Sequence, residues 1–356
     1  MPLSFPRRDD RGILLALDNM ISRIIGMGET VMDILFHEQE VESPNNQGTH
    51  EGAISKKYVP FSAEPGGSSF NTMISVARSG VPCHFIGYTG NNRVGREIID
   101  FMQSNGLSTD YFQIRGGEKT AISLAYLDEN GDADYTFYKD EPLDAEPCAT
   151  PDFTSEDYLL YGSYFSISKG LRRLVTNTLY KANDANTVIY YDINFRRSHQ
   201  HQINDLLPNI QENCRLSSIV RGSADDFEIL FGTRDAQEIY DKHISPLCPV
   251  FICTSGAGHI YLCTPSATYD FDVPQIPSSE IVSTVGAGDN FNAGFLCAMR
   301  HRSIRKSDLE NLPLSTWQEL VAEGIRYSAQ VCRSRFNRAD GHRRRRSLIF
   351  RDTFPL

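Results

Sequence analysis

Short apolar runs alternate with segments of helical periodicity along most of this chain, and this alternation limits the fold more than any other feature. Apolar residues between Phe70 and Ala77 recur at helical spacing, and Gly80 follows them. Strands that alternate with helices predict a mostly parallel sheet covered on both faces. We expect strands at 24–28, 83–87, 158–161, 188–192, 218–220 and 250–254, and later helices at 94–102, 291–299 and 317–331.

Two parts of the chain depart from this alternation. The β-rich runs 121–127 and 133–138 are joined by Asn130-Gly131, a strong hairpin signal, and residues 36–65 are polar and rich in Gly and Pro. We assign both to a small β lid at the carboxyl edge of the sheet, where open α/β folds bind ligands. The predicted organisation is a poorly ordered extension over 1–19, a main domain over 20–335 with lid segments near 36–64 and 108–140, and a basic tail over 336–356.

Composition excludes several classes of protein. A net charge of -10 argues against nucleic acid as the main partner. No apolar run approaches the roughly 20 residues that cross a bilayer, the N-terminus is not typical of a secretory signal, and the eight cysteines form no CxxC pair. We therefore expect a cytoplasmic protein with free thiols and no membrane partner. The basic run 343–346 is either an anion-binding tail or a solvated end.

The segment Gly286-Ala287-Gly288-Asp289 precedes an amphipathic helix. Small residues leave the backbone N–H groups uncovered at a helix start, where they attract an anion. Asp289 in the first turn can accept a proton from whatever docks there, and phosphoryl transfer needs both features side by side. The segment alone is equally compatible with a glycine-rich N-cap and an ordinary capping Asp.

Two earlier segments are candidates for polyol binding. Gly66 and Gly67 open a helix and let a polyol approach the backbone, while Asn71 offers a donor and an acceptor to hydroxyl groups. The same residues are compatible with a plain helix start. Asp33 follows the first strand and either holds adjacent hydroxyls or is a surface acid. A dinucleotide fingerprint is incomplete here, because its third glycine falls at Val31.

Five segments of the chain, in the order in which they occur, resemble the ribokinase or PfkB-type carbohydrate kinase family. The resemblance runs from about Ile24 to Cys332. No G-x-x-x-x-G-K-[ST] segment and no protein-kinase loop signature occurs in the sequence. The most specific of the five is Gly286 to Asp289. The others are Gly66-Gly67 to Asn71, Phe85-Ile86-Gly87 through Gly95, Asp192-Ile193-Asn194-Phe195-Arg196, and Thr254-Ser255-Gly256-Ala257-Gly258.

The resemblance implies a ribokinase-like three-layer α/β/α sandwich with a β lid, dimerisation through the lid, and transfer of the γ-phosphoryl group of ATP with Mg²⁺. It implies that Asp289 is the general base and that the backbone of 286–289 holds the developing charge. The implied sugar site comprises Asp33, Gly66, Gly67, Asn71 and Arg196. The implied nucleotide site comprises Ser223, Thr254, Gly256 and Gly258, with Asp226 at the metal.

The sequence departs from the family pattern at three places. Ser283 stands where the family usually has Asp, which leaves K⁺ dependence open, and Asn92 also replaces an Asp. Ser223 stands in place of the Asn, and Asp226 in place of the Glu, of the family's N-x-x-E segment. Gly28-Glu29 followed by Asp33 looks like the fructokinase and 2-keto-3-deoxygluconate kinase branch, so fructose or a related keto sugar is favoured. The alternatives are a kinase-like sugar-binding or regulatory protein and a nicotinamide-dependent oxidoreductase.

Overall fold

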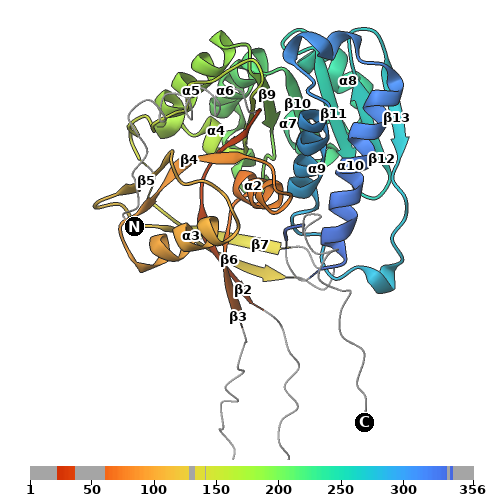
Figure 1. The fold of residues 1–356 in the computed structure, drawn as a ribbon. Coiled ribbons are helices and arrows are strands. Elements are labelled where there is room, and N and C mark those ends of the chain that lie inside the picture. The colour runs from red at the N-terminus through yellow and green to blue at the C-terminus, as the bar shows by residue number, and fades with distance from the viewer. Residues whose placement is uncertain (1–21, 37–60, 128–132, 141, 335–336, 340–356) are drawn as a thin grey trace, which may run out of the picture.

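A nine-stranded sheet forms the frame of the molecule (Figure 1). The computed structural model describes residues 22–36, 61–127, 133–140, 142–334 and 337–339. Neighbouring strands of this sheet are parallel except where β12 pairs with β11 and β13. In sheet order the strands are β13 (Thr268–Asp272), β12 (His259–Cys263), β11 (Val250–Ser255), β10 (Ile219–Ser223), β9 (Val188–Asp192), β8 (Tyr158–Gly162), β1 (Ile24–Met27), β4 (Cys83–Gly90) and β5 (Phe112–Arg115).

Helices cover both faces of this sheet, because successive strand side chains enter opposite cores. Tyr190 belongs to one buried cluster and Tyr191 to the other. The first core includes α2 (Ser68–Arg78), α3 (Arg93–Ser104), α9 (Ala287–His301) and α10 (Leu314–Cys332), and the second includes α4 (Ser163–Ile167), α5 (Arg172–Asp184), α6 (Ile203–Leu216), α7 (Ala224–Phe231) and α8 (Ala236–Ile239). The predicted three-layer α/β/α architecture is confirmed.

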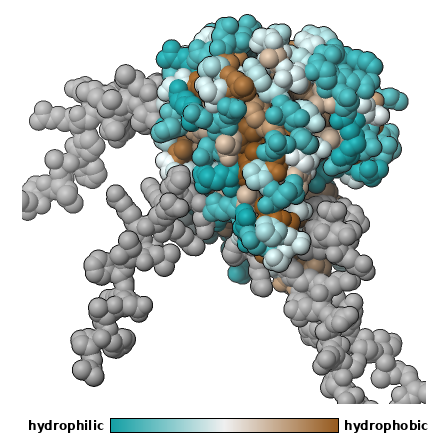
Figure 2. Space-filling view, turned by 90° about the vertical axis from the view of Figure 1, so that its right-hand side faces the viewer, coloured by the Kyte–Doolittle hydropathy of each residue, from teal (hydrophilic) through white to brown (hydrophobic). Residues whose placement is uncertain are grey.

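Short helical turns connect these elements. They are η1 (Lys169–Leu171), η2 (Arg197–Gln202), η3 (Tyr240–Ile244), η4 (Ser278–Glu280) and η5 (Lys306–Asn311). None of the helices in the described ranges combines the length and apolar character that a bilayer crossing requires. The face on the β13 side of the sheet is mostly hydrophilic, with a narrow apolar strip down its middle (Figure 2).

A separate four-stranded sheet forms the lid, in the order β3 (Phe61–Gly66), β2 (Val31–Phe36), β6 (Ala121–Leu127) and β7 (Ala133–Tyr138). The predicted hairpin is present as the antiparallel pair β6 and β7. β5 falls inside the range 108–140 assigned to the lid, but it pairs with β4 at the edge of the main sheet. Residues 37–60, which make up most of the other predicted lid segment, lie outside the described residues.

The lid strands β2 and β3 and the edge strands β12 and β13 were not predicted individually. β3 contains Pro65 and is exposed over its first three residues, so it lacks the apolar run that marks a buried strand. β13 alternates between exposed and half-buried residues at the outer edge of the sheet. Strands of this kind are stabilised by pairing with a neighbouring strand. The periodicity of the sequence does not indicate that pairing.

The segment Asn337–Ala339 corrects the predicted domain boundary. Arg338 is 4% exposed and Ala339 is fully buried. The Ala339 N–H donates to Asn290 Oδ1 at 2.9 Å and to Ser75 Oγ at 3.1 Å. The main domain therefore continues past residue 335, because its C-terminal segment packs between α2 and α9. The N-terminal extension 1–19 and the basic run 343–346 lie outside the described residues.

Candidate active site

A cavity of about 360 Å³ lies between the lid and the carboxyl ends of β1, β8 and β9. Segments far apart in the sequence meet there, as expected for an open parallel sheet. Six residues predicted from the sequence line it, namely Asp33, Gly67, Asn71, Arg196, Gly286 and Asp289. The predicted sugar site and the predicted base are therefore in one place.

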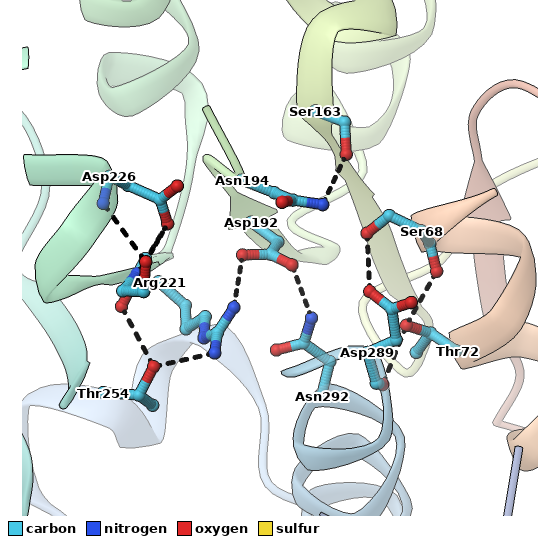
Figure 3. A network of polar contacts seen from close by, with 12 residues as sticks. Ser68, Thr72, Ser163, Asp192, Asn194, Arg221, Asp226, Thr254, Asp289 and Asn292 are labelled. Carbon is cyan, nitrogen blue, oxygen red and sulfur yellow. Dashed lines mark hydrogen bonds and ion pairs between the residues drawn. The ribbon is translucent and has the colours of Figure 1, made fainter. Parts of the chain in front are cut away.

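Asp289 lies in the first turn of α9 with its carboxylate held by α2 (Figure 3). Ser68 Oγ donates to Oδ1 at 2.8 Å, and Asn71 Nδ2 donates to Oδ2 at 3.1 Å. Burial raises the pKa of Asp289, and these two hydrogen bonds oppose that rise. A carboxyl group in this state is fixed in direction and has a strengthened affinity for a proton, as a general base requires.

Two side-chain oxygens in the cavity wall have no hydrogen-bond partner among the described residues. They are Oδ1 of Asn71 and Oδ1 of Asn337, and both are fully covered by neighbouring atoms. Buried acceptors without a donor are uncommon in folded proteins, since leaving one unpaired costs about 1–3 kcal/mol. The wall of the cavity thus holds two covered acceptors without a donor among the described residues.

Helix α9 begins at Gly286, whose φ of 80° lies in the left-handed region. A side chain at this position would also approach the Asn337 carbonyl oxygen to 2.8 Å. No side chain caps the helix, although the Ala287 N–H donates to Thr284 O at 3.2 Å. Gly288 lies against the Arg221 guanidinium, which is 3.0 Å from where its Cβ would be. The helix start is thus compact, and Val285, Gly286 and Asp289 of this segment line the cavity.

Asp33 enters the cavity from β2 and is enclosed by the lid. Ser123 on β6 donates a hydrogen bond to its Oδ1, and Gly66 on β3 leaves room for Oδ2, because a Cβ there would overlap the carboxylate. Burial is the main cause that raises the pKa of Asp33 to about 6. Gly67, with φ of 119°, brings the backbone close to the Glu29 carbonyl. The absence of side chains at Gly66 and Gly67 thus lets the chain pack closely against Asp33 and Glu29.

A second polar cluster lies beside the cavity, at the carboxyl ends of β9, β10 and β11 (Figure 3). The buried Arg221 guanidinium donates to Asp192 Oδ1 at 3.0 Å and to Thr254 Oγ1 at 2.8 Å. Asn292 on α9 donates to the other oxygen of Asp192 at 2.7 Å. Burial disfavours the charge on Arg221, but Asp192 and the neighbouring Tyr190 outweigh it, so the pKa of Arg221 lies above its ordinary value.

The other predicted nucleotide and metal residues adjoin this cluster. Ser223 and Asp226 form a capping box at the start of α7, in which Asp226 Oδ2 accepts from the Ser223 N–H at 2.7 Å and from Ser223 Oγ at 2.8 Å. Burial raises the pKa of Asp226. Gly256 and Gly258 lie in the turn between β11 and β12. The described residues contain no cluster of three or more His, Cys, Asp or Glu that could hold a metal ion.

Several cavity residues were missed by the sequence reasoning. Lys139 beyond β7 pairs with Glu29 at 2.9 Å, and Tyr164 stacks on His199 with ring centroids 3.9 Å apart. Burial, followed by the charge of Lys139, lowers the pKa of His199 to about 4. These residues come from four separate segments without a shared motif. Arg221 did have a signal, since a cation inside an apolar strand, two residues before Ser223, indicates a buried ion pair.

Comparison with known proteins agrees with this arrangement. The chain is 26% identical over 236 residues to the aminoimidazole riboside kinase of Salmonella typhimurium, covering 65% of this chain and 72% of the relative. It is 24% identical over 283 residues to a probable fructokinase-5 of Arabidopsis thaliana, covering 78% and 82%. It is also 24% identical over 253 residues to a 5-dehydro-2-deoxygluconokinase of Geobacillus thermodenitrificans, covering 67% and 73%.

Solved structures share the fold. The aminoimidazole riboside kinase of Salmonella enterica, in complex with aminoimidazole riboside and an ATP analog, superposes with a TM-score of 0.68 at 21% identity, covering 88% of this chain and 94% of the other. The fructokinase of Xylella fastidiosa with bound ATP gives a TM-score of 0.70 at 18% identity, covering 88% and 92%. These neighbours therefore define the fold as a ribokinase-like α/β fold.

The chain belongs to the pfkB family of carbohydrate kinases, whose model matches residues 27–315. It is accordingly a phosphotransferase with an alcohol group as acceptor. This membership removes the nicotinamide-dependent oxidoreductase from consideration.

Proposed function

We propose that the protein transfers the γ-phosphoryl group of ATP to a hydroxyl group of a keto sugar, with fructose as the first candidate. The observation that carries this proposal is the Asp289 carboxylate, which α2 fixes in a cavity that also holds Asp33 and the unpaired oxygens of Asn71 and Asn337. A polyol supplies hydroxyl donors for the carboxylates of Asp33 and Asp289, which line this cavity. The probable fructokinase relative supports the choice of sugar.

In this proposal Asp289 takes the proton of the reacting hydroxyl group. The freed oxygen attacks the γ-phosphorus, and the bond from that phosphorus to the bridging oxygen of ADP breaks. The backbone at 286–289 stabilises the charge on the transferred group through the N–H groups at the start of α9. Asp33 accepts hydrogen bonds from hydroxyl groups of the acceptor on the lid side. Arg196, which lines the same cavity, contacts the acceptor.

ATP would lie over the second polar cluster. Ser223, Thr254, Gly256 and Gly258 surround the carboxyl ends of β10 and β11, beside the start of α9. The Ser223 and Thr254 hydroxyl groups already have intrachain partners, so we assign the nucleotide mainly to backbone contacts there. Mg²⁺ is usually held by phosphates and one or two carboxylates, and Asp226 would be the carboxylate that holds it here. When bound, the ion would neutralise charge on the phosphates.

A riboside is a second candidate acceptor. The relative from Salmonella typhimurium is named for one, and the stacked rings of Tyr164 and His199 in the cavity wall offer a flat surface to a base-like substituent. At neutral pH the lowered pKa of His199 keeps this surface uncharged.

The lid also carries a candidate dimer surface. Phe36, Phe61 and Tyr126 form an aromatic cluster, in which the rings of Phe36 and Tyr126 are 4.7 Å apart. Phe61 is 63% exposed and Tyr126 is 50% exposed, although side chains of this size are usually covered. We therefore include a homodimer through the lid in the proposal.

ADP release from ATP, measured with fructose, ribose, 2-keto-3-deoxygluconate and ribosides, tests the proposal. We expect turnover with at least one acceptor, fastest with fructose, and loss of turnover in Asp289→Ala. Sugar binding without turnover would favour a regulatory protein instead. Turnover that survives in Asp289→Ala would refute the role of the base while leaving the kinase class intact.

A further inference from the structure

Arg338 is an unusual residue for the position it occupies. Its side chain is 1% exposed, in a segment that follows α10 and reaches back to the cavity. Nη1 contacts Glu64 on lid strand β3 at 3.3 Å, and the guanidinium carbon lies 4.7 Å from the ring centroid of Phe101. Nε and Nη2 have no hydrogen-bond partner among the described residues.

The burial of this cation is energetically unfavourable. Burying a charge without full pairing costs several kcal/mol, and burial is the main cause that lowers the pKa of Arg338 to about 10. The carboxylates that offset this cost are Glu64 and Asp33, both of which favour the charged form. They lie opposite each other on the paired strands β2 and β3.

The influence is mutual. Of the charged groups that act on Asp33, Arg338 has the strongest effect, followed by Asp289 on α9 and Arg196 after β9. Ser123 contributes the hydrogen bond from β6. The neighbouring residues Asn337 and Ala339 are themselves bonded to Asn290, which directly follows the proposed base. Arg338 is therefore anchored to α9 on one side and to the lid on the other.

We propose that Arg338 is a positioning residue of the acceptor site, which contacts Glu64 opposite Asp33 on the lid and is anchored to α9 through the adjoining Ala339. The proposal rests on the function proposed above only for the identity of the acceptor. An effect of Arg338 on the titration of Asp33 can be measured in the free protein without any substrate.

The experiment is a ¹³C NMR titration of protein labelled at the aspartate carboxyl carbons, with the Asp33 resonance assigned through Asp33→Asn. We expect Asp33 to titrate near pH 6 in the unmodified protein. Arg338→Met should shift this titration to higher pH, because an opposite charge is lost, and Arg338→Lys should stay closer to the unmodified protein. Arg333→Gln is the matched control, since Arg333 pairs with Glu280 at the surface of the same segment.

Glu64→Gln gives a second measurement with the opposite sign. Removal of that carboxylate takes a negative charge from the neighbourhood and leaves Asp33 as the main partner of Arg338, so Asp33 should titrate at lower pH. This variant keeps Arg338 and serves as the test if Arg338→Met does not fold. Unchanged Asp33 titration in every folded variant would overturn the proposal, whether or not the protein phosphorylates a sugar.

Discussion

Asn71 Nδ2 lies 3.1 Å from Oδ2 of Asp289, so one side chain joins the start of α2 to the proposed base. The Asn71 Oδ1 atom meanwhile stays without a partner among the described residues. This single amide thus orients the Asp289 carboxylate with one atom and keeps the other buried and unpaired.

Asp289→Asn should reduce kcat by about 10²–10⁴-fold, because an amide keeps the size of the side chain but cannot take the hydroxyl proton. The measurement is ADP release at saturating ATP and acceptor. Asp100→Asn, on the exposed surface of α3, is the matched control and should leave kcat unchanged. A thermal unfolding midpoint equal to that of the unmodified protein would exclude misfolding as the cause.

Ser68→Ala should move the acid limb of the kcat/KM profile to higher pH. The Ser68 hydroxyl bonds to the ionised form of Asp289 and opposes the rise of its pKa that burial causes. The base is active only when ionised, so activity falls as the pH decreases through this pKa, and loss of the donor starts that fall at higher pH. Profiles of the two proteins from pH 5 to 8 would show the shift, and superimposed acid limbs would contradict it.

Asn337→Ala should raise KM for the acceptor by about tenfold, as expected when one hydrogen bond of about 1.4 kcal/mol is lost, while KM for ATP stays constant. The reason is that Asn337 lines the cavity and is not part of the nucleotide cluster. Equal increases in both KM values would indicate a general disturbance of the site.

Gly66→Ala should weaken acceptor binding by tenfold or more, because the new methyl group displaces the Asp33 carboxylate. Overpacking of this kind typically costs about 1–3 kcal/mol. Gly116→Ala is the control, since nothing lies within 4 Å of the added atom. Initial rates at varied acceptor concentration, together with unfolding midpoints, separate the loss of binding from the loss of stability.

Arg221→Met should destabilise the fold by about 3–5 kcal/mol, because it leaves the buried Asp192 carboxylate without its cation. Arg333→Gln removes a pair whose side chains are 43% and 48% exposed, and it should cost about 0–1 kcal/mol. Urea unfolding of both variants measures the difference. Similar costs for the two variants would contradict the assignment of Asp192 and Arg221 as a buried pair.

Tyr126→Ser should shift the protein toward the monomer if the lid cluster forms the dimer surface. Tyr180→Ser is the matched control, because Tyr180 is 49% exposed on α5, away from the lid. Sedimentation velocity over a range of protein concentrations gives the oligomeric state. A monomer in the unmodified protein at all concentrations would remove the dimer from the proposal.

The main sheet could be predicted from the sequence because its strands are buried on both faces and appear as continuous apolar runs. Tyr158–Gly162 and Val188–Asp192 are examples, since every residue in them is buried. That Asp289 and Asn71 lie in one cavity could be expected, because the order of their segments resembles that of the family. The contact of Arg338 with Glu64 did not, because the two residues are 274 positions apart and neither belongs to a motif.

The basic residues after Cys332 are a second example of an environment that the sequence alone does not predict. In the sequence, Arg338 is one of several arginines in a charged stretch, which usually indicates a solvated end. Its burial depends on its contacts with Phe70, Phe101 and the lid, which form only after these elements have packed. Charge composition therefore indicated the wrong environment for Arg338.

The return of Asn337–Ala339 to the start of α9 has a consequence for the order in which contacts form during synthesis. Synthesis proceeds from the N-terminus, and domains generally begin to fold as their chain emerges. Strands β1 to β11 and the lid can pair early, but Asn290 receives its last donor only when Ala339 has left the ribosome. A nascent chain can thus pair these strands before the contacts around Asn290, next to the proposed base, are complete.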